Sequence, residues 1–123
     1  MMQRGIRGAT TVENDSVNEI TTAVVGLINE MMTKNQIFTE EISHVIFTMT
    51  EDLKSVNPAK CARENIEGFN KVPMMCVPEL KTDNSLKQCV RVLIVINTES
   101  EQDKIKHVYL KEAKKLRVDL TNA

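Results

Sequence analysis

The sequence predicts an α+β domain, in which helices cover one face of a mixed β-sheet. Residues 89–96 are an apolar run rich in β-branched residues, which is typical of a buried strand. Residues 20–31 repeat apolar side chains at helical intervals. Strands and helices are expected to alternate along the chain, and 123 residues with 41% hydrophobic content fit a single domain over residues 1–123.

Residues 3–10 are predicted to form a first, short strand that contains Gly5 and Gly8. A glycine in a strand has no side chain, so another backbone or a ligand can come close to it. Arg4 and Arg7 are three positions apart in this strand. Because side chains alternate along a strand, the two arginines point to opposite faces, and at most one of them reaches a given site.

A long amphipathic helix is expected to follow this strand. Ser16 and Glu19 have the spacing of a capping box, and apolar residues then recur at helical intervals until Asn35. The exposed side of this helix carries ordinary polar residues, so we assign the helix a scaffold role.

Residues 43–50 are predicted to form the second strand, with Val45, Phe47 and Met49 on one face. The remaining strands are expected at residues 71–77, 87–97 and 104–110. Pro73 cannot donate a ladder hydrogen bond, which favours an edge or irregular position for the strand that contains it. The run at residues 87–97 is predicted to be the central strand, and a basic tail follows residue 110.

A short helix is predicted between the second and third strands. Asn57 and Pro58 suit the N-cap and first helical position, and the helix is expected to run to about residue 66. Lys60 and Arg63 are three residues apart and share a face. Spacing alone supports equally well a solvated surface, on which each cation pairs with a glutamate one turn further along.

Arg91 interrupts the apolar run of the central strand. We expect this strand to be buried on both faces, where an unpaired guanidinium costs several kcal/mol or more. Arg91 therefore needs an anionic partner. For an isolated buried arginine, a structural ion pair with a carboxylate is the ordinary explanation.

Bulk composition excludes several classes of function. Sixteen basic and seventeen acidic residues leave a formal charge of −1, so there is no overall field to attract nucleic acid or an anionic membrane. Aromatic content of 3% leaves no stacking platform for single-stranded nucleic acid. Any recognition of an anion must therefore be local.

The cysteines and the N-terminal segment indicate the compartment. Cys61, Cys76 and Cys89 form neither an even set nor a metal-binding spacing, so we expect no disulfide and no metal. Neither a secretory leader nor a membrane span is apparent. We expect a cytoplasmic protein.

Five residues stand in segments that together resemble a known family: Arg7 in RGIRGATT, Glu79 in CVPEL, Arg91 in the central strand, and Tyr109 and Arg117 in IKHVYLKEAKKLR. In this order and at these separations they resemble the AroH-class chorismate mutases over nearly the whole chain. The resemblance implies an isomerase that converts chorismate to prephenate for aromatic amino acid biosynthesis. It also implies a homotrimer around a barrel-like core, a pseudo-α/β barrel, with active sites at the subunit interfaces.

The chemistry of this reaction suits those residue types. Chorismate is a dianion with two carboxylates, a ring hydroxyl and an enol-ether bridge, and its rearrangement requires neither a cofactor nor a metal. The catalyst has to hold the enolpyruvyl arm over the ring and stabilise negative charge on the ether oxygen. Arginine forks suit the carboxylates and the ether oxygen, and an anionic acceptor suits the hydroxyl.

The resemblance implies a role for each residue. Arg91 would donate to the ether oxygen, Arg7 with Tyr109 would hold the enolpyruvyl carboxylate, Glu79 would accept the hydroxyl proton, and Cys76 would line the hydroxyl side. Three further cations, Lys60, Arg63 and Arg117, would help to retain the dianion.

Several residues have a plainer explanation. Tyr109 is also explained as a half-buried core aromatic, Glu79 as an exposed turn carboxylate, and Cys76 as a buried small hydrophobe. The basic tail is equally consistent with solvated charge. The two histidines, His44 and His107, are expected to be bystanders.

The chain departs from the family pattern at two places. Asn57 stands where the family usually has an aromatic residue. One extra residue lies between Arg63 and Val72, where we expect a loop. The first departure leaves the apolar cover over the substrate either thinner or supplied by another side chain, and the second affects the placement of Lys60 and Arg63.

Two other functions are consistent with parts of the sequence. A trimeric small-molecule binding or imine-hydrolysing protein of the RidA-like group also grips a carboxylate with a buried arginine. Its substrate does not need a hydroxyl acceptor beside a second carboxylate clamp, so the combination of Arg7, Glu79 and Tyr109 favours chorismate mutase. A catalytically silent regulatory module is the third possibility, and it would tolerate loss of charge at Arg91.

Overall fold

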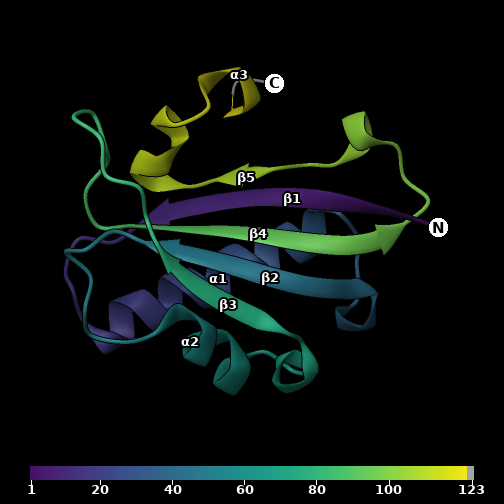
Figure 1. Ribbon diagram of the computed structural model, residues 1–123, viewed down its shortest axis with the longest axis horizontal. Coiled ribbons are helices and arrows are strands. Elements are labelled where there is room, and N and C mark those ends of the chain that lie inside the picture. Colours follow the sequence, from purple (N-terminus) through teal and green to yellow (C-terminus); the bar gives the residue numbers. More distant parts are fainter. Residues whose placement is uncertain (122–123) are drawn as a thin grey trace.

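A five-stranded mixed sheet runs through the centre of the computed structural model, which describes residues 1–121 (Figure 1). Its strands are β1 (Met2–Thr11), β2 (Ile42–Met49), β3 (Met74–Pro78), β4 (Cys89–Thr98) and β5 (Val108–Tyr109). Their order across the sheet is β3-β2-β4-β1-β5. β4 pairs antiparallel with β1 and β2, whereas the outer pairs β2–β3 and β1–β5 are parallel. The mixed sheet, the central position of β4 and the edge position of the proline-preceded strand are confirmed.

Two helices cover one face of this sheet: α1 (Val17–Lys34) and α2 (Pro58–Asn65). The two predicted N-caps are confirmed, but the capping box at Ser16 is only half formed, because the Glu19 carboxylate accepts from the Asn14 backbone N–H at 3.1 Å instead of from Ser16. The hydroxyl of Ser16 accepts a hydrogen bond from the Glu19 backbone N–H at 3.1 Å, and the Asn57 side chain accepts from Ala59 at 2.8 Å. Both helices therefore begin at positions where a side chain satisfies an otherwise unpaired N–H group.

Short helical turns make up most of the remaining regular structure: the 3₁₀ helices η1 (Thr39–Glu41), η2 (Phe69–Lys71), η3 (Gln102–Lys104) and η4 (Lys111–Lys115), and the four-residue helix α3 (Val118–Thr121). In the described part of the chain, no helix has both the length and the apolar character that crossing a membrane requires.

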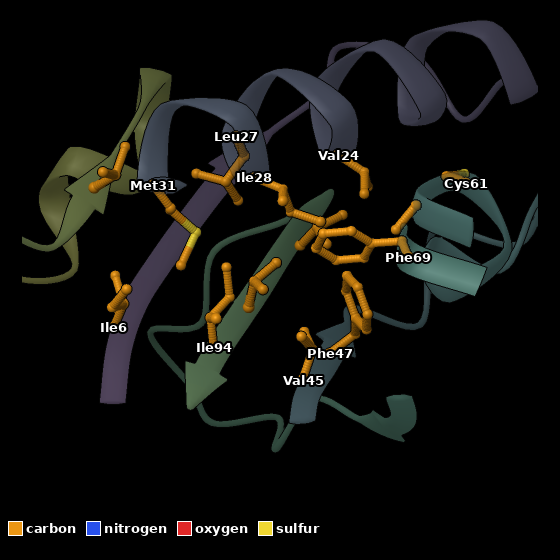
Figure 2. Packing of buried hydrophobic residues seen from close by; sticks show 14 of the residues in the cluster. Ile6, Val24, Leu27, Ile28, Met31, Val45, Phe47, Cys61, Phe69 and Ile94 are labelled. Carbon is orange, nitrogen blue, oxygen red and sulfur yellow. The ribbon is translucent and has the colours of Figure 1, made fainter. Parts of the chain in front are cut away.

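The core lies between α1 and the sheet. Val24, Leu27, Ile28 and Met31 of α1 are fully buried and point towards Ile6, Val45, Phe47 and Ile94 of the strands (Figure 2). Each such side chain contributes about 1.5–3 kcal/mol through burial. The apolar residues that repeat at helical intervals in the sequence thus form the face of α1 that packs against the sheet.

Gly8 is needed where α1 crosses β1. A Cβ atom at Gly8 would lie 2.3 Å from the Met31 sulfur and 2.8 Å from its methyl carbon. The close approach foreseen for this glycine is therefore made by a core methionine. The absent side chain lets α1 settle onto the sheet.

The expected burial of β4 on both faces is wrong within a single chain. Val90, Val92, Ile94 and Ile96 are buried beneath α1 and α2, but Leu93 on the other face is 37% exposed. We call this second face the open face; it carries Thr48, Arg91 and Leu93. Within residues 1–121 no layer of helices lies over it, so β4 has the alternating burial of a strand covered on one side.

Two strand boundaries also differ from prediction. β3 begins at Met74 because Lys71 belongs to η2 and Pro73 has no N–H to donate. The last strand is confined to Val108 and Tyr109, after which η4 and α3 pack their apolar residues against Ala9 and Tyr109. The basic tail is therefore attached to the β5 edge of the sheet, as the yellow end of the ribbon shows (Figure 1).

Candidate active site

One row of residues crosses all five strands on the open face. Val77 pairs with Thr48, Thr48 with Arg91, Arg91 with Ala9, and Ala9 with Tyr109. Paired residues point to the same face, so the side chains of this row project together. The pairing brings Arg91 and Tyr109 to the same level, with only the small Ala9 between them.

A cavity of about 270 Å³ lies over this row. Its walls come from β1, β2, β4, β5 and the segment after β3: Arg7, Gly8, Ile46, Thr48, Glu79, Arg91, Val92, Leu93 and Tyr109. Four of the eight site residues predicted from the sequence, Arg7, Glu79, Arg91 and Tyr109, therefore surround one space. They come from distant parts of the chain, and the sheet register brings them together.

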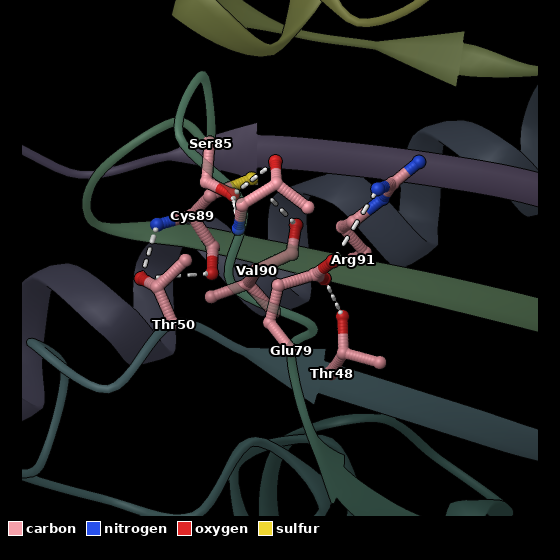
Figure 3. A network of polar contacts seen from close by, with 8 residues as sticks. Thr48, Thr50, Glu79, Ser85, Cys89, Val90 and Arg91 are labelled. Atoms are coloured by element: carbon pink, nitrogen blue, oxygen red, sulfur yellow. Dashed lines mark hydrogen bonds and ion pairs between the residues drawn. The ribbon is translucent and has the colours of Figure 1, made fainter.

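Glu79 lies between Thr48 and Arg91 (Figure 3). One carboxylate oxygen, Oε1, accepts a short hydrogen bond from the Thr48 hydroxyl, and the other, Oε2, lies 3.5 Å from a terminal nitrogen of Arg91. The Glu79 backbone N–H also donates to Met49 O at 3.2 Å. The side chain of Glu79 is only 16% exposed, so its interpretation as an exposed turn carboxylate is wrong.

Arg91 keeps much of its donor capacity. Its side chain is 39% exposed, and its ion pair with Glu79 is long at 3.5 Å. An ion pair of this length with one half-exposed partner contributes little to stability. The guanidinium is thus oriented by one carboxylate while its remaining N–H groups face the cavity side of the sheet.

Arg7 contacts a residue that sequence reasoning set aside. Its backbone N–H donates to Nδ1 of His107 at 2.9 Å, and one terminal guanidinium nitrogen lies 3.3 Å from Nε2 of the same ring. His107 therefore contacts a predicted site residue, and whether it is a bystander in catalysis stays a prediction. Arg4 pairs with Ile96 of the buried face whereas Arg7 pairs with Leu93 of the open face, so the predicted division of the two arginines is confirmed.

Tyr109 forms the β5 wall of the cavity. It is 6% exposed and packs in a small apolar cluster with Ala9 and Ala113. The plainer interpretation as a core aromatic thus holds for its ring. Because Tyr109 also lines the cavity beside Arg7, its packing and a binding role are compatible.

Cys89 stands at the start of β4, two residues before Arg91, and is buried. Burial raises the pKa of its thiol to about 11, although the nearby Arg91 charge acts in the opposite direction. The thiol is therefore protonated at neutral pH. Within residues 1–121, no group of His, Cys, Asp or Glu side chains has the arrangement of a metal site.

The other predicted site residues lie apart from the cavity. Cys76 pairs with Phe47, whose side chain is in the core beneath the helices, so Cys76 and Arg91 are on opposite faces of the sheet. Cys76 is exposed, which contradicts its interpretation as a buried small hydrophobe, and its thiol donates to Asn57 Oδ1 at 3.2 Å. Lys60, on the helix that Asn57 caps, is also exposed.

Lys60 and Arg63 lie on the surface of α2 and do not line the cavity. Within residues 1–121 neither forms an ion pair, so the expected pairing with neighbouring glutamates is absent there. After α2 the chain turns through Gly68, whose φ is 86°, before η2 begins. Cys76, Asn57, Lys60 and Arg63 form a second group, which we call the α2 group.

Arg117 lies beyond η4 and is tied to Asp119 by two hydrogen bonds, at 3.0 and 2.7 Å. It does not line the cavity. Its charge nevertheless helps to lower the pKa of His107, which shows that it lies on the Tyr109 side of the site. A substrate carboxylate would have to displace Asp119 to use both donor groups.

Sequence reasoning missed Thr48 and His107. The alternation of side chains along β2 that places Phe47 in the core also places Thr48 on the opposite face. The face occupied by Thr48 could therefore have been predicted from the sequence. That alternation did not reveal the contact with Glu79, which depends on the turn after β3. Likewise, the contact between His107 and Arg7 depends on the parallel pairing of β1 with β5.

Comparisons with known proteins identify the family of this chain. The family model described as chorismate mutase type I matches residues 3–120. Chorismate mutase AroH of Bacillus subtilis strain 168 is 40% identical over 121 residues, covering 98% of this chain and 94% of that protein. Chorismate mutase AroH of Thermus thermophilus is 46% identical over 123 residues, with 99% of each chain covered. A solved chorismate mutase from Clostridium thermocellum has a TM-score of 0.85 and 40% identity, covering 89% of this chain and 96% of its own.

Proposed function

The chain belongs to the chorismate mutase type I family, and we propose that the cavity on the open face is the part of its active site that carries the chemistry. The protein is an isomerase that converts chorismate to prephenate. The imine-hydrolysing alternative has no support among these relatives. The observation that carries the assignment of the cavity is the meeting of Arg7, Glu79 and Arg91 around it.

The reaction needs positioning and charge stabilisation. As the ether bond breaks, negative charge grows on its oxygen, and a permanently charged, planar donor lowers the barrier most effectively. We assign this role to Arg91, because Glu79 orients its guanidinium and part of its donor capacity remains unused. The stabilisation grows in the transition state, so it accelerates the chemical step.

Arg7 and Tyr109 would hold the enolpyruvyl carboxylate. They flank the β1–β5 side of the cavity, opposite Glu79 and Thr48 on the β2 side. Glu79 would accept the ring hydroxyl through its carboxylate while Thr48 keeps that carboxylate in place. Clamping both ends of the substrate would hold the enolpyruvyl arm over the ring, which lowers the entropic part of the barrier.

The α2 group would complete the site from a neighbouring subunit in a homotrimer. Support comes from its position on the other face of the sheet, where it cannot line the cavity of its own chain. The open face also exposes apolar side chains, including Met75 at 62%, Val77 at 38% and Leu93 at 37%. Three such faces packed around an axis would form the expected pseudo-α/β barrel and cover those side chains.

In that arrangement Lys60, Arg63 and Cys76 of one subunit would meet Arg91 of the next. Asn57 would offer a polar side chain in place of the family aromatic residue. Arg117 would retain the bound dianion after exchanging Asp119 for a substrate carboxylate. We also propose that residues 1–123 act as one domain and, from the sequence, that the enzyme works in the cytoplasm.

The test of function is loss of chorismate absorbance with purified protein, with no metal or nucleotide added and with EDTA present. We expect first-order conversion to prephenate, identified as the product by chromatography. A well-folded protein that leaves chorismate unchanged beyond the uncatalysed rate would overturn the proposed function.

A further inference from the structure

The ring of His107 lies against both the backbone and the side chain of Arg7. The backbone N–H of Arg7 donates to Nδ1 at 2.9 Å, and the guanidinium lies 3.3 Å from Nε2. A neutral imidazole has one acceptor nitrogen, so it accepts from one of these groups at a time. A protonated imidazole carries a hydrogen on both nitrogens and accepts from neither.

The imidazole also ends the β1–β5 ladder. Gly8 and Ala9 pair with Val108 and Tyr109, and the Leu110 N–H donates to Ala9 O at 2.9 Å. One residue earlier, the Arg7 N–H binds the His107 ring. This explains why β5 has only two residues. It also means that the backbone of Arg7 loses its partner if the ring stops accepting.

The position of His107 is fixed by the preceding residue. The side-chain amide of Asn35, the C-cap of α1, donates to Lys106 O at 2.8 Å and accepts from Lys106 N at 2.8 Å. These two bonds hold the backbone beside His107 against the end of α1. A continuous chain of contacts therefore runs from α1 through Lys106 and His107 to Arg7.

The charged surroundings of His107 are mostly cationic. Arg7 from β1 and Arg117 from the segment after η4 act on it directly, and Lys106 is its chain neighbour. The larger cavity that His107 borders carries Glu30 and Lys34 from α1, Asp103 and Lys104 from η3, and Lys114 and Lys115 from η4. Partial burial, Arg7 and Arg117 together lower the pKa of His107 from its ordinary value of 6.5. The ring is therefore neutral at pH 7.

We propose that the neutral imidazole of His107 is a positioning residue for Arg7, and that protonation of His107 in acid releases Arg7 and weakens capture of the substrate carboxylate. This inference rests on the function proposed above, because it gives the site a pH-dependent support. His107 does not touch the reacting atoms, so its effect should fall mainly on KM. The N–H donors of Arg91, which serve the chemical step, do not depend on His107.

The experiment compares steady-state rates with chorismate from pH 5 to pH 8 in four proteins: wild type, His107→Asn, His107→Phe and the control His44→Asn. Asparagine places its Oδ1 on Cγ, as histidine places Nδ1, so it retains an acceptor for Arg7 without a titratable ring. Phenylalanine retains a ring but has no acceptor. His44 lies outside the cavity, and the hydrogen bond of its ring within residues 1–121 is with the Ser43 hydroxyl, at 3.1 Å.

For His107→Phe we expect a KM about tenfold higher at pH 7.5 with kcat nearly unchanged, the size of effect that a lost orienting hydrogen bond produces. The wild type and His44→Asn should lose kcat/KM below pH 6.5, whereas His107→Asn should keep its neutral-pH value there. Circular dichroism checks the fold of each variant.

An active wild type with an unchanged KM in His107→Phe overturns the inference and leaves the proposed function standing. An acidic decline in His107→Asn equal to that of the wild type also overturns it. If His107→Phe does not fold, the pH profile of His107→Asn decides alone. An inactive wild type, by contrast, is the failure of the proposed function.

Discussion

Thr48 and Arg91 face each other directly across the β2–β4 ladder, and both contact the same carboxylate, that of Glu79. The hydroxyl of Thr48 holds one oxygen, and Arg91 lies near the other. This division fixes the rotation of the carboxylate about its side chain. It also leaves Glu79 between Thr48 and Arg91 in the wall of the cavity.

Replacing Thr48 with Val should therefore reduce kcat/KM by about tenfold or more, because one hydrogen bond to a charged group contributes about 1.5–3 kcal/mol. Thr48→Ser keeps the hydroxyl and should stay near the wild-type rate. Thr50→Ser is a matched control, because Thr50 bonds to Asp52 and to the Cys89 backbone instead of Glu79. A Thr48→Val variant with normal kinetics would show that Glu79 does not depend on Thr48.

Replacing Arg91 with Ala should lower kcat by about 100- to 1000-fold or more, with a much smaller effect on substrate binding. The guanidinium supplies charge that matters most when the ether oxygen becomes negative. Arg4→Ala is the control, since Arg4 lies on the same sheet but bonds to Ser100 O. Near-normal turnover in a folded Arg91→Ala protein would make Arg91 structural and the mechanism wrong.

The sequence was sufficient for most of the fold because local signals and tertiary packing agree. The caps at Ser16 and Asn57, the apolar stripe of α1 and the apolar run of β4 each indicate the element that forms. The sequence was misleading where the burial of an element depends on what packs against it from elsewhere in the protein. An apolar run does not reveal that one face of β4 lacks a covering layer in its own chain.

The site, like the fold, was predictable in part. Arg7, Glu79, Arg91 and Tyr109 were predicted through family resemblance, and the sheet register brings them to one cavity. The contacts of Thr48 and His107 follow from the pairing of segments that lie 31 and 100 residues from their partners. Local periodicity carries no information about such pairings. The α2 group is separate in the single chain, so its place in the site stays a prediction.

Mixing two inactive variants tests whether the site is shared between subunits. Arg91→Ala removes the cavity arginine, and a Lys60→Ala, Arg63→Ala double variant removes the α2 cations. If sites are composite, unfolding and refolding the two proteins together should restore about a quarter of the sites, because random mixing pairs two intact halves that often. Sedimentation should show trimers. No recovery in mixed, folded trimers would show that the α2 group does not complete the cavity of a neighbouring subunit.

Truncating the chain before Arg117 should raise KM more than it lowers kcat, because the segment contributes retention of the dianion and not chemistry. Asp119→Asn tests the same residue with the chain intact. This substitution weakens the ion pair between Arg117 and residue 119, which leaves Arg117 freer to bind the substrate, so KM should stay the same or fall. An unchanged KM after truncation would assign Arg117 to ordinary surface charge.

Between pH 7 and pH 9, turnover should be nearly flat and insensitive to chelators, because the rearrangement transfers no proton to a protein group. The Cys89 thiol does not ionise in this range, since burial raises its pKa to about 11. Below pH 7, the direction in which the stability of the fold changes follows from the pKa of His107. Its pKa is lowered in the folded protein, so the neutral ring contributes stability above pH 6.5, and this contribution is lost as the pH falls towards the folded-state value. Urea unfolding at pH 5 and pH 7.5 should show a smaller loss of stability in His107→Asn than in the wild type. A steep change in turnover between pH 7 and pH 9 in folded protein would instead identify an acid or base that this mechanism lacks.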